Sequence, residues 1–119
     1  MSIIKILFVF GTRPEAIKMA KLIQQIDTNS NFSSKVCVTG QHREMLDQVL
    51  ELYDIKPDFD LEIMEQNQDL TDVTNKTLTG LRNIFAKWLP DMVLVQGDTS
   101  TAFTTALAAF YKKIKVGHI

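Results

Sequence analysis

The sequence has 119 residues, of which 45% are hydrophobic and 23% are charged, and its formal net charge at pH 7 is −1. A chain of this length forms one domain and buries roughly two-thirds of the surface that its unfolded state exposes. Lysine and arginine are scattered along the chain, which argues against nucleic acid or an anionic membrane as the main partner, because both select basic patches.

The first predicted element is a buried strand over Ile3–Phe10, a run of apolar residues. The run has no small-residue cleavage site after it, unlike a secretory signal peptide, and no run in the chain approaches the length of a membrane span. A helix follows, with Pro14 in its first turn and Glu15 at the positive end of the helix dipole. Its apolar residues recur at the spacing of one helical face: Met19, Leu22, Ile23 and Ile26.

A second, short strand is predicted around Lys35–Thr39. It contains Cys37, which is the single cysteine of the chain and is most simply a small core residue of a cytosolic protein. A second helix is marked by four apolar or aromatic residues: Leu46, Val49, Leu50 and Tyr53. A third strand is predicted near Leu61–Met64, and Pro57 and nearby acids indicate that it lies at an edge of the sheet.

The longest predicted helix opens at Asn67–Asp69 and stops before Pro90. Its expected buried stripe is Leu70, Val73, Leu81, Ile84, Phe85 and Trp88. A fourth strand over Asp91–Gln96 leads into another helix, and a fifth strand begins at Lys115. In that last helix one face carries Phe103, Ala106, Leu107 and Phe110. The opposite side is rich in alanine, which suits burial against neighbours.

Five strands that alternate with four helices predict a three-layer α/β fold with a doubly wound parallel sheet. The first and fourth strands are the most continuously apolar, so we place them centrally, in the strand order 3-2-1-4-5. The order reverses between strands one and four, which brings the segments Gly11–Glu15 and Gln96–Thr101 side by side. Ligands of open parallel sheets bind at such a switch point, outside the carboxyl ends of the strands.

The segment Gly11–Glu15 has two interpretations. It can bind a phosphate or diphosphate, through the free N–H groups of a helix N-terminus, the forked donor of Arg13, and Lys18 one turn further on. It can equally be a tight turn with two solvated cations. The segment is neither a G-x-G-x-x-G fingerprint nor a Walker loop, so no dinucleotide site or NTPase follows.

Asp98 stands at the end of a central strand, where it can cap the next helix or take part in proton transfer. The alternative caps are Thr99, Ser100 and Thr101. His42 can bind a ligand or hydrogen-bond its own loop, with the loop role favoured, and His118 more simply packs or orients a neighbour. No cluster has metal-ligand spacing, and neither a Ser-His-Asp set nor a catalytic-cysteine context is visible.

Four motifs taken together resemble the non-hydrolysing bacterial UDP-N-acetylglucosamine 2-epimerases. These motifs are Gly11–Lys18, Thr39–Leu50, Val95–Ala102 and Val116–Ile119, and the resemblance spans essentially the whole chain. The resemblance implies that residues 1–119 form the N-terminal Rossmann-like domain of a two-domain GT-B architecture. Family chains are much longer, so we expect the C-terminal nucleotide-binding domain to lie outside these residues and the chain alone to be inactive.

The resemblance also implies an activity. The family interconverts UDP-N-acetylglucosamine and UDP-N-acetylmannosamine for cell-surface polysaccharide synthesis. UDP leaves C1 as the C2 proton is removed, and both are then added back with the proton on the other face. The implied enzyme is a cytoplasmic isomerase and a homodimer, and it uses no cofactor.

Arg13, Lys18 and Asp98 match family positions that contact the substrate. By this resemblance the two cations stabilise the departing diphosphate, and Asp98 is an acid/base or orients one. Gln41, His42 and Glu44 match a region where some bacterial members hold a second UDP-N-acetylglucosamine as an activator. Those members carry an arginine near residues 65–68, where this chain has Gln66 and Asn67.

Three other protein classes share part of this pattern. A stand-alone sugar-nucleotide-binding or regulatory module would have the same sheet and no catalysis. A phosphoacceptor receiver domain shares the strand order, but its first turn carries clustered acids where this chain has Arg13. A related nucleotide-sugar glycosyltransferase leaves the complete set of motifs unexplained.

Overall fold

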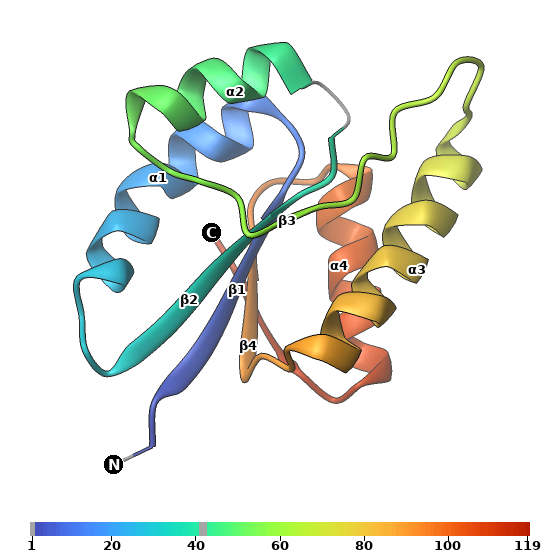
Figure 1. Cartoon of the computed structure of the whole chain (residues 1–119). Coiled ribbons are helices and arrows are strands. Elements are labelled where there is room, and N and C mark those ends of the chain that lie inside the picture. Colours follow the sequence, from blue (N-terminus) through green and yellow to red (C-terminus); the bar gives the residue numbers. More distant parts are fainter. Residues whose placement is uncertain (1, 41–42) are drawn as a thin grey trace.

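The computed structural model describes residues 2–40 and 43–119 and contains five strands that alternate with four helices (Figure 1). In chain order the elements are β1 (Ile4–Phe10), α1 (Arg13–Asp27), β2 (Phe32–Val38), α2 (Arg43–Leu52), β3 (Phe59–Asp60), α3 (Leu70–Lys87), β4 (Met92–Val95), α4 (Ser100–Tyr111) and β5 (Lys115–His118). In the described residues no helix is both long enough and apolar enough to cross a lipid bilayer.

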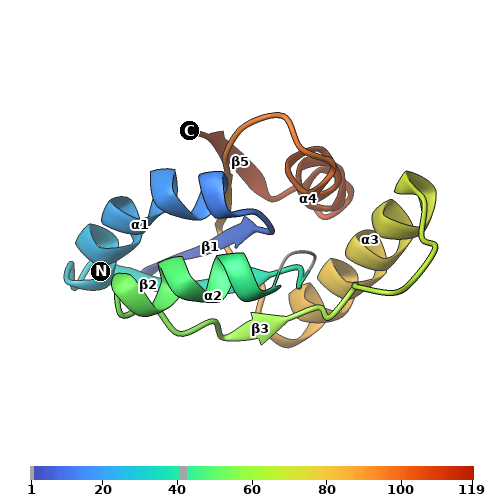
Figure 2. The ribbon, with the colours of Figure 1, turned by 90° about the horizontal axis from the view of Figure 1, so that it is seen from above.

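The strands form one parallel sheet in the order β3-β2-β1-β4-β5, which confirms the predicted topology. Helices α1 and α2 cover one face of the sheet, and α3 and α4 cover the other, so the molecule has three layers (Figure 2). The reversal of strand order lies between β1 and β4. The loops that follow these two strands therefore emerge side by side at one rim of the sheet.

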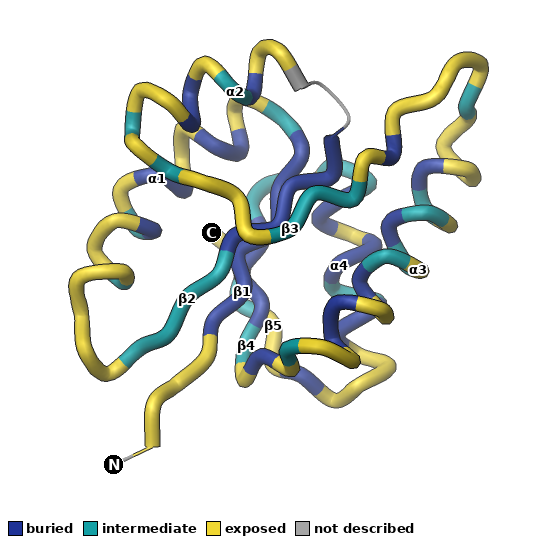
Figure 3. Tube along the Cα trace, in the orientation of Figure 1, coloured by how far each residue is buried: buried dark blue, intermediate teal, exposed yellow. Residues whose placement is uncertain are grey.

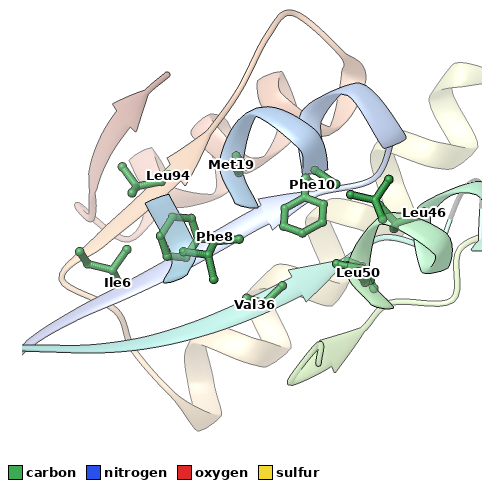
Figure 4. Packing of buried hydrophobic residues seen from close by; sticks show 12 residues of the cluster. Ile6, Phe8, Phe10, Met19, Val36, Leu46, Leu50 and Leu94 are labelled. Atoms are coloured by element: carbon green, nitrogen blue, oxygen red, sulfur yellow. The ribbon is translucent and has the colours of Figure 1, made fainter. Parts of the chain in front are cut away.

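The alternating side chains of β1 anchor an apolar core on each face of the sheet. Phe8 and Phe10 pack with Met19 and Leu46 beneath α1 and α2 (Figure 4). The intervening residues of β1 join the cluster under α3 and α4, which includes Leu7, Val9, Leu81, Phe85 and Val93. Buried positions follow the strands and the inward faces of the helices (Figure 3). Each fully buried side chain of this size contributes about 1.5–3 kcal/mol through removal of apolar surface from water.

Cys37 lies in the cluster under α3 and α4 and is fully buried, as predicted for a core residue. Burial, assisted by the charge of Asp60, raises the pKa of its thiol to about 12. The thiol is therefore neutral at physiological pH and is not a nucleophile, because the thiolate is the reactive form.

The predicted third strand at Leu61–Met64 is wrong, because β3 consists of Phe59–Asp60. The predicted segment does run beside the end of β2, where the Leu61 N–H donates to the Val38 carbonyl at 2.9 Å. Glu62, however, adopts a φ of 51°, which interrupts extended backbone. The second strand is longer than predicted and begins at Phe32.

The start of α3 was predicted at Asn67–Asp69, and the last of these residues is the N-cap, whose side chain forms a capping box with Asp72. Leu70, expected in the buried stripe, is instead 69% exposed at the first residue of this helix. In α4 the side that packs inward is the small-residue side: Thr101, Ala102, Thr104, Thr105, Ala108 and Ala109. The opposite, aromatic face is exposed at Phe103 and Phe110.

Candidate functional site

The loops after β1 and β4 meet at the carboxyl rim of the sheet, at the end of β1 opposite the N-terminus of the chain (Figure 1). Gly11 is buried where the two loops approach. A Cβ atom added to Gly11 would lie 2.2 Å from Thr39 Oγ1 and 3.2 Å from Thr101 Oγ1. Glycine is therefore required here, because the end of β2 and the first turn of α4 leave no room for a side chain.

Thr12 begins α1 as its N-cap. Its hydroxyl oxygen accepts the Glu15 N–H at 3.5 Å, and its hydroxyl proton is donated to Glu15 Oε1 at 2.7 Å. Arg13 is the first residue of the helix and is exposed, and Pro14 follows it in the first turn as predicted. Lys18 is exposed further along the same helix. The structure thus places both candidate cations at or near the N-terminus of α1.

Glu15 is a buried carboxylate that the sequence interpretation treated only as a dipole-compensating residue. It is 1% exposed, and burial raises its pKa. Interactions with the Thr12 side chain, the Gly11 backbone and the Thr99 side chain each lower that pKa in part. Oε2 accepts no hydrogen bond from any described residue. The spacing of Thr12 and Glu15 is that of a capping box, which was the available signal, but it does not reveal the burial.

Asp98 is not the cap of α4, because Thr99 is the N-cap and its hydroxyl oxygen accepts the Ala102 N–H at 3.2 Å. Of the two roles left open for Asp98, capping is therefore excluded. Its side chain is exposed in the turn made by Gly97, whose φ is 77°. His118 Nε2 lies 2.7 Å from the Gly97 carbonyl oxygen, so the histidine orients this turn from β5, in line with its predicted role.

A pocket of about 380 Å³ lies beside this turn, between α4 and β5. Its lining includes Gly97, Asp98, Thr99, Phe103, Val116 and His118. The pocket therefore presents one carboxylate and one imidazole next to an apolar wall. Arg13 and Lys18 are not in this lining and stand on the neighbouring loop and helix.

The region matched to the activator site is only partly described. Gln41 and His42 lie outside the described residues, and Glu44 is exposed in the first turn of α2. Beside residues 65–68, Lys76 of α3 has its Nζ 2.6 Å from Glu65 Oε2 and donates to Gln68 Oε1 at 3.0 Å. This lysine is thus engaged with the segment that precedes its helix, and activator binding stays a prediction.

Comparisons with known proteins agree on one family. The family model described as UDP-N-acetylglucosamine 2-epimerase matches residues 24–119. A UDP-N-acetylglucosamine 2-epimerase of Campylobacter jejuni is 59% identical over 97% of this chain, which covers 30% of that protein. The crystal structure of the Neisseria meningitidis enzyme bound to UDP-GlcNAc superposes on 98% of this chain with a TM-score of 0.92 and 55% identity, over 32% of its own length.

A more distant structure superposes equally completely. The Methanocaldococcus jannaschii UDP-GlcNAc 2-epimerase in complex with UDP-GlcNAc and UDP is 30% identical, covers 98% of this chain and has a TM-score of 0.90. This chain spans about a third of the length of each of these relatives.

Proposed function

This chain belongs to the UDP-N-acetylglucosamine 2-epimerase family, and we propose that it is the N-terminal Rossmann-like domain of an enzyme that interconverts UDP-N-acetylglucosamine and UDP-N-acetylmannosamine. The observation that carries the proposal is the shared rim, where Arg13 follows β1 and Asp98 follows the adjacent β4. The chain spans about a third of its relatives, so we assign the remaining substrate contacts to a C-terminal nucleotide-binding domain.

The proposed reaction is an elimination followed by an addition. The C2 proton of the sugar is removed, and the electron pair of the C2–H bond forms the C1=C2 double bond of a 2-acetamidoglucal. The bond from C1 to the diphosphate oxygen breaks at the same time, and UDP takes its electron pair. UDP then adds back to C1, and a proton adds to the opposite face of C2. The net change is an inversion at C2 without oxidation, which requires no redox cofactor.

Each rim residue has a proposed role in these steps. Arg13 and Lys18 stabilise the negative charge that grows on the departing diphosphate, since preorganised cations act most strongly where charge develops. Asp98 exchanges the C2 proton or orients the group that does so. Its freedom from capping supports this role, because Thr99 already satisfies the N-terminus of α4.

Three further assignments belong to the same proposal. We place the enzyme in the cytoplasm, in keeping with its single, buried and free cysteine, and in the synthesis of cell-surface polysaccharide. We propose a homodimer whose contact includes the exposed aromatic face of α4 at Phe103 and Phe110. Glu44, together with Gln41 and His42, stays the candidate contact for an activating second UDP-sugar.

The proposal is tested by titrating UDP into the isotope-labelled chain and following its amide resonances. We expect shifts at Arg13, Lys18 and Asp98, and weaker binding in Arg13→Ala by about tenfold or more, because a hydrogen bond to a charged group contributes about 1.5–3 kcal/mol. The control is Arg82→Ala, which removes an exposed cation from α3 and should leave the affinity unchanged. Equal losses in both variants would contradict the assignment.

Catalysis is tested separately with the same chain. We expect no conversion of UDP-N-acetylglucosamine above the rate of a blank, because most proposed substrate contacts lie outside these residues. Measurable turnover by the chain alone would show that the rim residues suffice for catalysis. The assignment of most substrate contacts to a second domain would then be wrong.

A further inference from the structure

We infer that His118 is a positioning residue for Asp98, because its imidazole holds the peptide unit that joins Gly97 to Asp98. The inference rests on the proposed function for its catalytic meaning, whereas its structural test needs no ligand. Neither the family comparisons nor the roles proposed above give His118 a part in the reaction.

The contact that carries the inference is a hydrogen bond between β5 and the turn that follows β4. His118 Nε2 lies 2.7 Å from the carbonyl oxygen of Gly97, a residue 21 positions earlier in the chain. A carbonyl oxygen only accepts, so Nε2 is the donor. This nitrogen carries a proton both in the neutral Nε2–H tautomer and in the imidazolium. The His118 ring therefore donates to the turn in either protonation state.

A hydrogen bond to the Gly97 oxygen acts directly on Asp98, since the two residues share one peptide unit. The atoms from Gly97 Cα to Asp98 Cα, which include this oxygen and the Asp98 N–H, lie close to one plane because the C–N bond has partial double-bond character. Restraining the oxygen therefore restrains the whole unit. The Cα atom from which the Asp98 carboxylate extends is fixed in the same way.

Packing around Gly97 does not hold this part of the turn. Gly97 has a φ of 77°, a conformation that glycine adopts without a steric penalty. A Cβ atom added there would meet nothing within 4 Å apart from its chain neighbours, and Asp98 is exposed. The Thr99 cap restrains the far side of the turn, where α4 begins. The hydrogen bond from His118 supplies the restraint on the near side.

The backbone that carries His118 is itself fixed against β4. His118 is in register with Val95, and the next amide, that of Ile119, donates to the Val95 carbonyl at 2.9 Å. Gly117 is in register with Leu94, whose side chain occupies the space that a side chain at position 117 would need. The strand therefore lies closely against β4 immediately before and after His118, which gives the ring a fixed base.

The proposed role of Asp98 makes its position important. In the proposed reaction Asp98 exchanges the C2 proton or orients the group that does so, and misplacement by about 1 Å at such a site costs on the order of a hundredfold in rate. The Nε2 proton of His118 is engaged with Gly97, so His118 acts through Asp98 and does not itself exchange a proton with the sugar.

The structural test measures motion of the Asp98 amide by nitrogen relaxation in the unliganded chain. His118→Phe keeps a planar ring and removes the donor, whereas His118→Gln retains an N–H donor at a similar reach. We expect the Asp98 order parameter to fall from about 0.85, typical of rigid backbone, to about 0.6 or below in His118→Phe. We expect His118→Gln to restore most of it. An unchanged value in His118→Phe, or an equal fall in both variants, would overturn the inference.

The matched control is Lys115→Gln, which changes an exposed residue at the other end of β5 and should leave the Asp98 amide rigid. A second measurement covers the case in which His118→Phe disturbs β5, because it uses the original chain. The nitrogen chemical shifts of the neutral imidazole should identify the Nε2–H tautomer of His118. The Nδ1–H tautomer has no proton on Nε2 to donate, and finding it would overturn the inference.

The functional readout separates recognition of the sugar from recognition of the diphosphate. The proposed diphosphate contacts, Arg13 and Lys18, do not depend on His118, so UDP should bind His118→Phe within about twofold of the original affinity. UDP-N-acetylglucosamine should bind this variant about threefold or more weakly, because an Asp98 that is mobile before binding must be ordered at a cost. His118→Gln should recover that loss.

The outcomes distinguish this inference from the proposed function. Equal weakening of UDP and of UDP-N-acetylglucosamine in His118→Phe would overturn the inference, because the effect would not act through Asp98. A mobile Asp98 with both affinities unchanged would support the hydrogen bond from His118 as the restraint on the turn, and it would contradict the proposed role of Asp98.

Discussion

Glu15 shows how one residue can differ from its local sequence signal. The Thr12–Glu15 spacing is that of a capping box, and in the structure the Thr12 hydroxyl both accepts the Glu15 N–H and donates to Glu15 Oε1. Glu15 is nevertheless 1% exposed, and burial of this kind depends on how the rest of the chain packs around the helix start, which no local pattern encodes. The same reasoning separates Asp98 from Thr99, because all the polar residues of that turn are good caps and only the folded geometry selects one.

The raised pKa of Glu15 predicts a pH dependence of stability. A carboxyl group whose pKa is higher in the folded state than its ordinary value of 4.5 binds its proton more tightly when folded. Its contribution to stability is therefore fully present below pH 4.5 and is lost as the pH rises through the folded-state pKa. Glu15→Gln removes this loss, so we expect the variant to gain stability relative to the original chain as the pH rises through that window.

The measurement is urea unfolding at a series of pH values. An exposed glutamate variant, Glu51→Gln, supplies the baseline for removing one carboxylate. Parallel stability curves for Glu15→Gln and the unmodified chain would contradict the prediction.

At the scale of elements, apolar periodicity predicted the alternation of strands and helices and the strand order. Residues that start or stop helices also predicted the ends of α3 well. Asp69 caps its start, and Pro90 follows shortly after its end. One feature was not readable, because the positive φ of Glu62 interrupts the predicted third strand. In α4 the alanine-rich side packs inward, as the sequence indicated, and the aromatic residues Phe103 and Phe110 are exposed.

The close approach of β1, β2 and α4 predicts a severe effect at Gly11. In Gly11→Ala the new methyl group would overlap Thr39 Oγ1, which lies on a fully buried side chain with little room to move. Overpacking of this kind costs typically about 1–3 kcal/mol, measured as the change in the free energy of unfolding.

The matched rescue is Gly11→Ala combined with Thr39→Ala, which removes the overlapping oxygen. We expect the double variant to recover most of the lost stability. A double variant as unstable as the sum of the two single changes would show that close approach to Thr39 is not the reason for glycine.

At the scale of the whole molecule, the exposed aromatic face of α4 is the clearest candidate for a contact between copies. Phe103 and Phe110 are 65% and 73% exposed and stand seven residues apart, on one side of the helix. Tyr111 is also exposed, and its ring centroid lies 6.3 Å from that of Phe110. Interfaces between proteins favour aromatic residues in this way, which supports the proposed homodimer.

Oligomeric state tests that contact directly. Light scattering after size exclusion should give the unmodified chain twice its own mass of 13.5 kDa. The variant Phe103→Lys combined with Phe110→Glu should run as a monomer. The control is Leu52→Lys, at a leucine 78% exposed on α2, which should remain a dimer. A monomeric unmodified chain, or equal dissociation in both variants, would contradict the proposal.

The apolar clusters and the carboxyl rim occupy different parts of the molecule, and this separation has an evolutionary consequence. Phe10 ends the buried run of β1, whereas Arg13, Lys18 and Asp98 are exposed and contribute little to the core. Exposed substitutions usually change stability by less than about 0.5 kcal/mol. Descendants of this scaffold can therefore exchange rim side chains and acquire new ligand preferences, while selection for folding acts mainly on the sheet beneath.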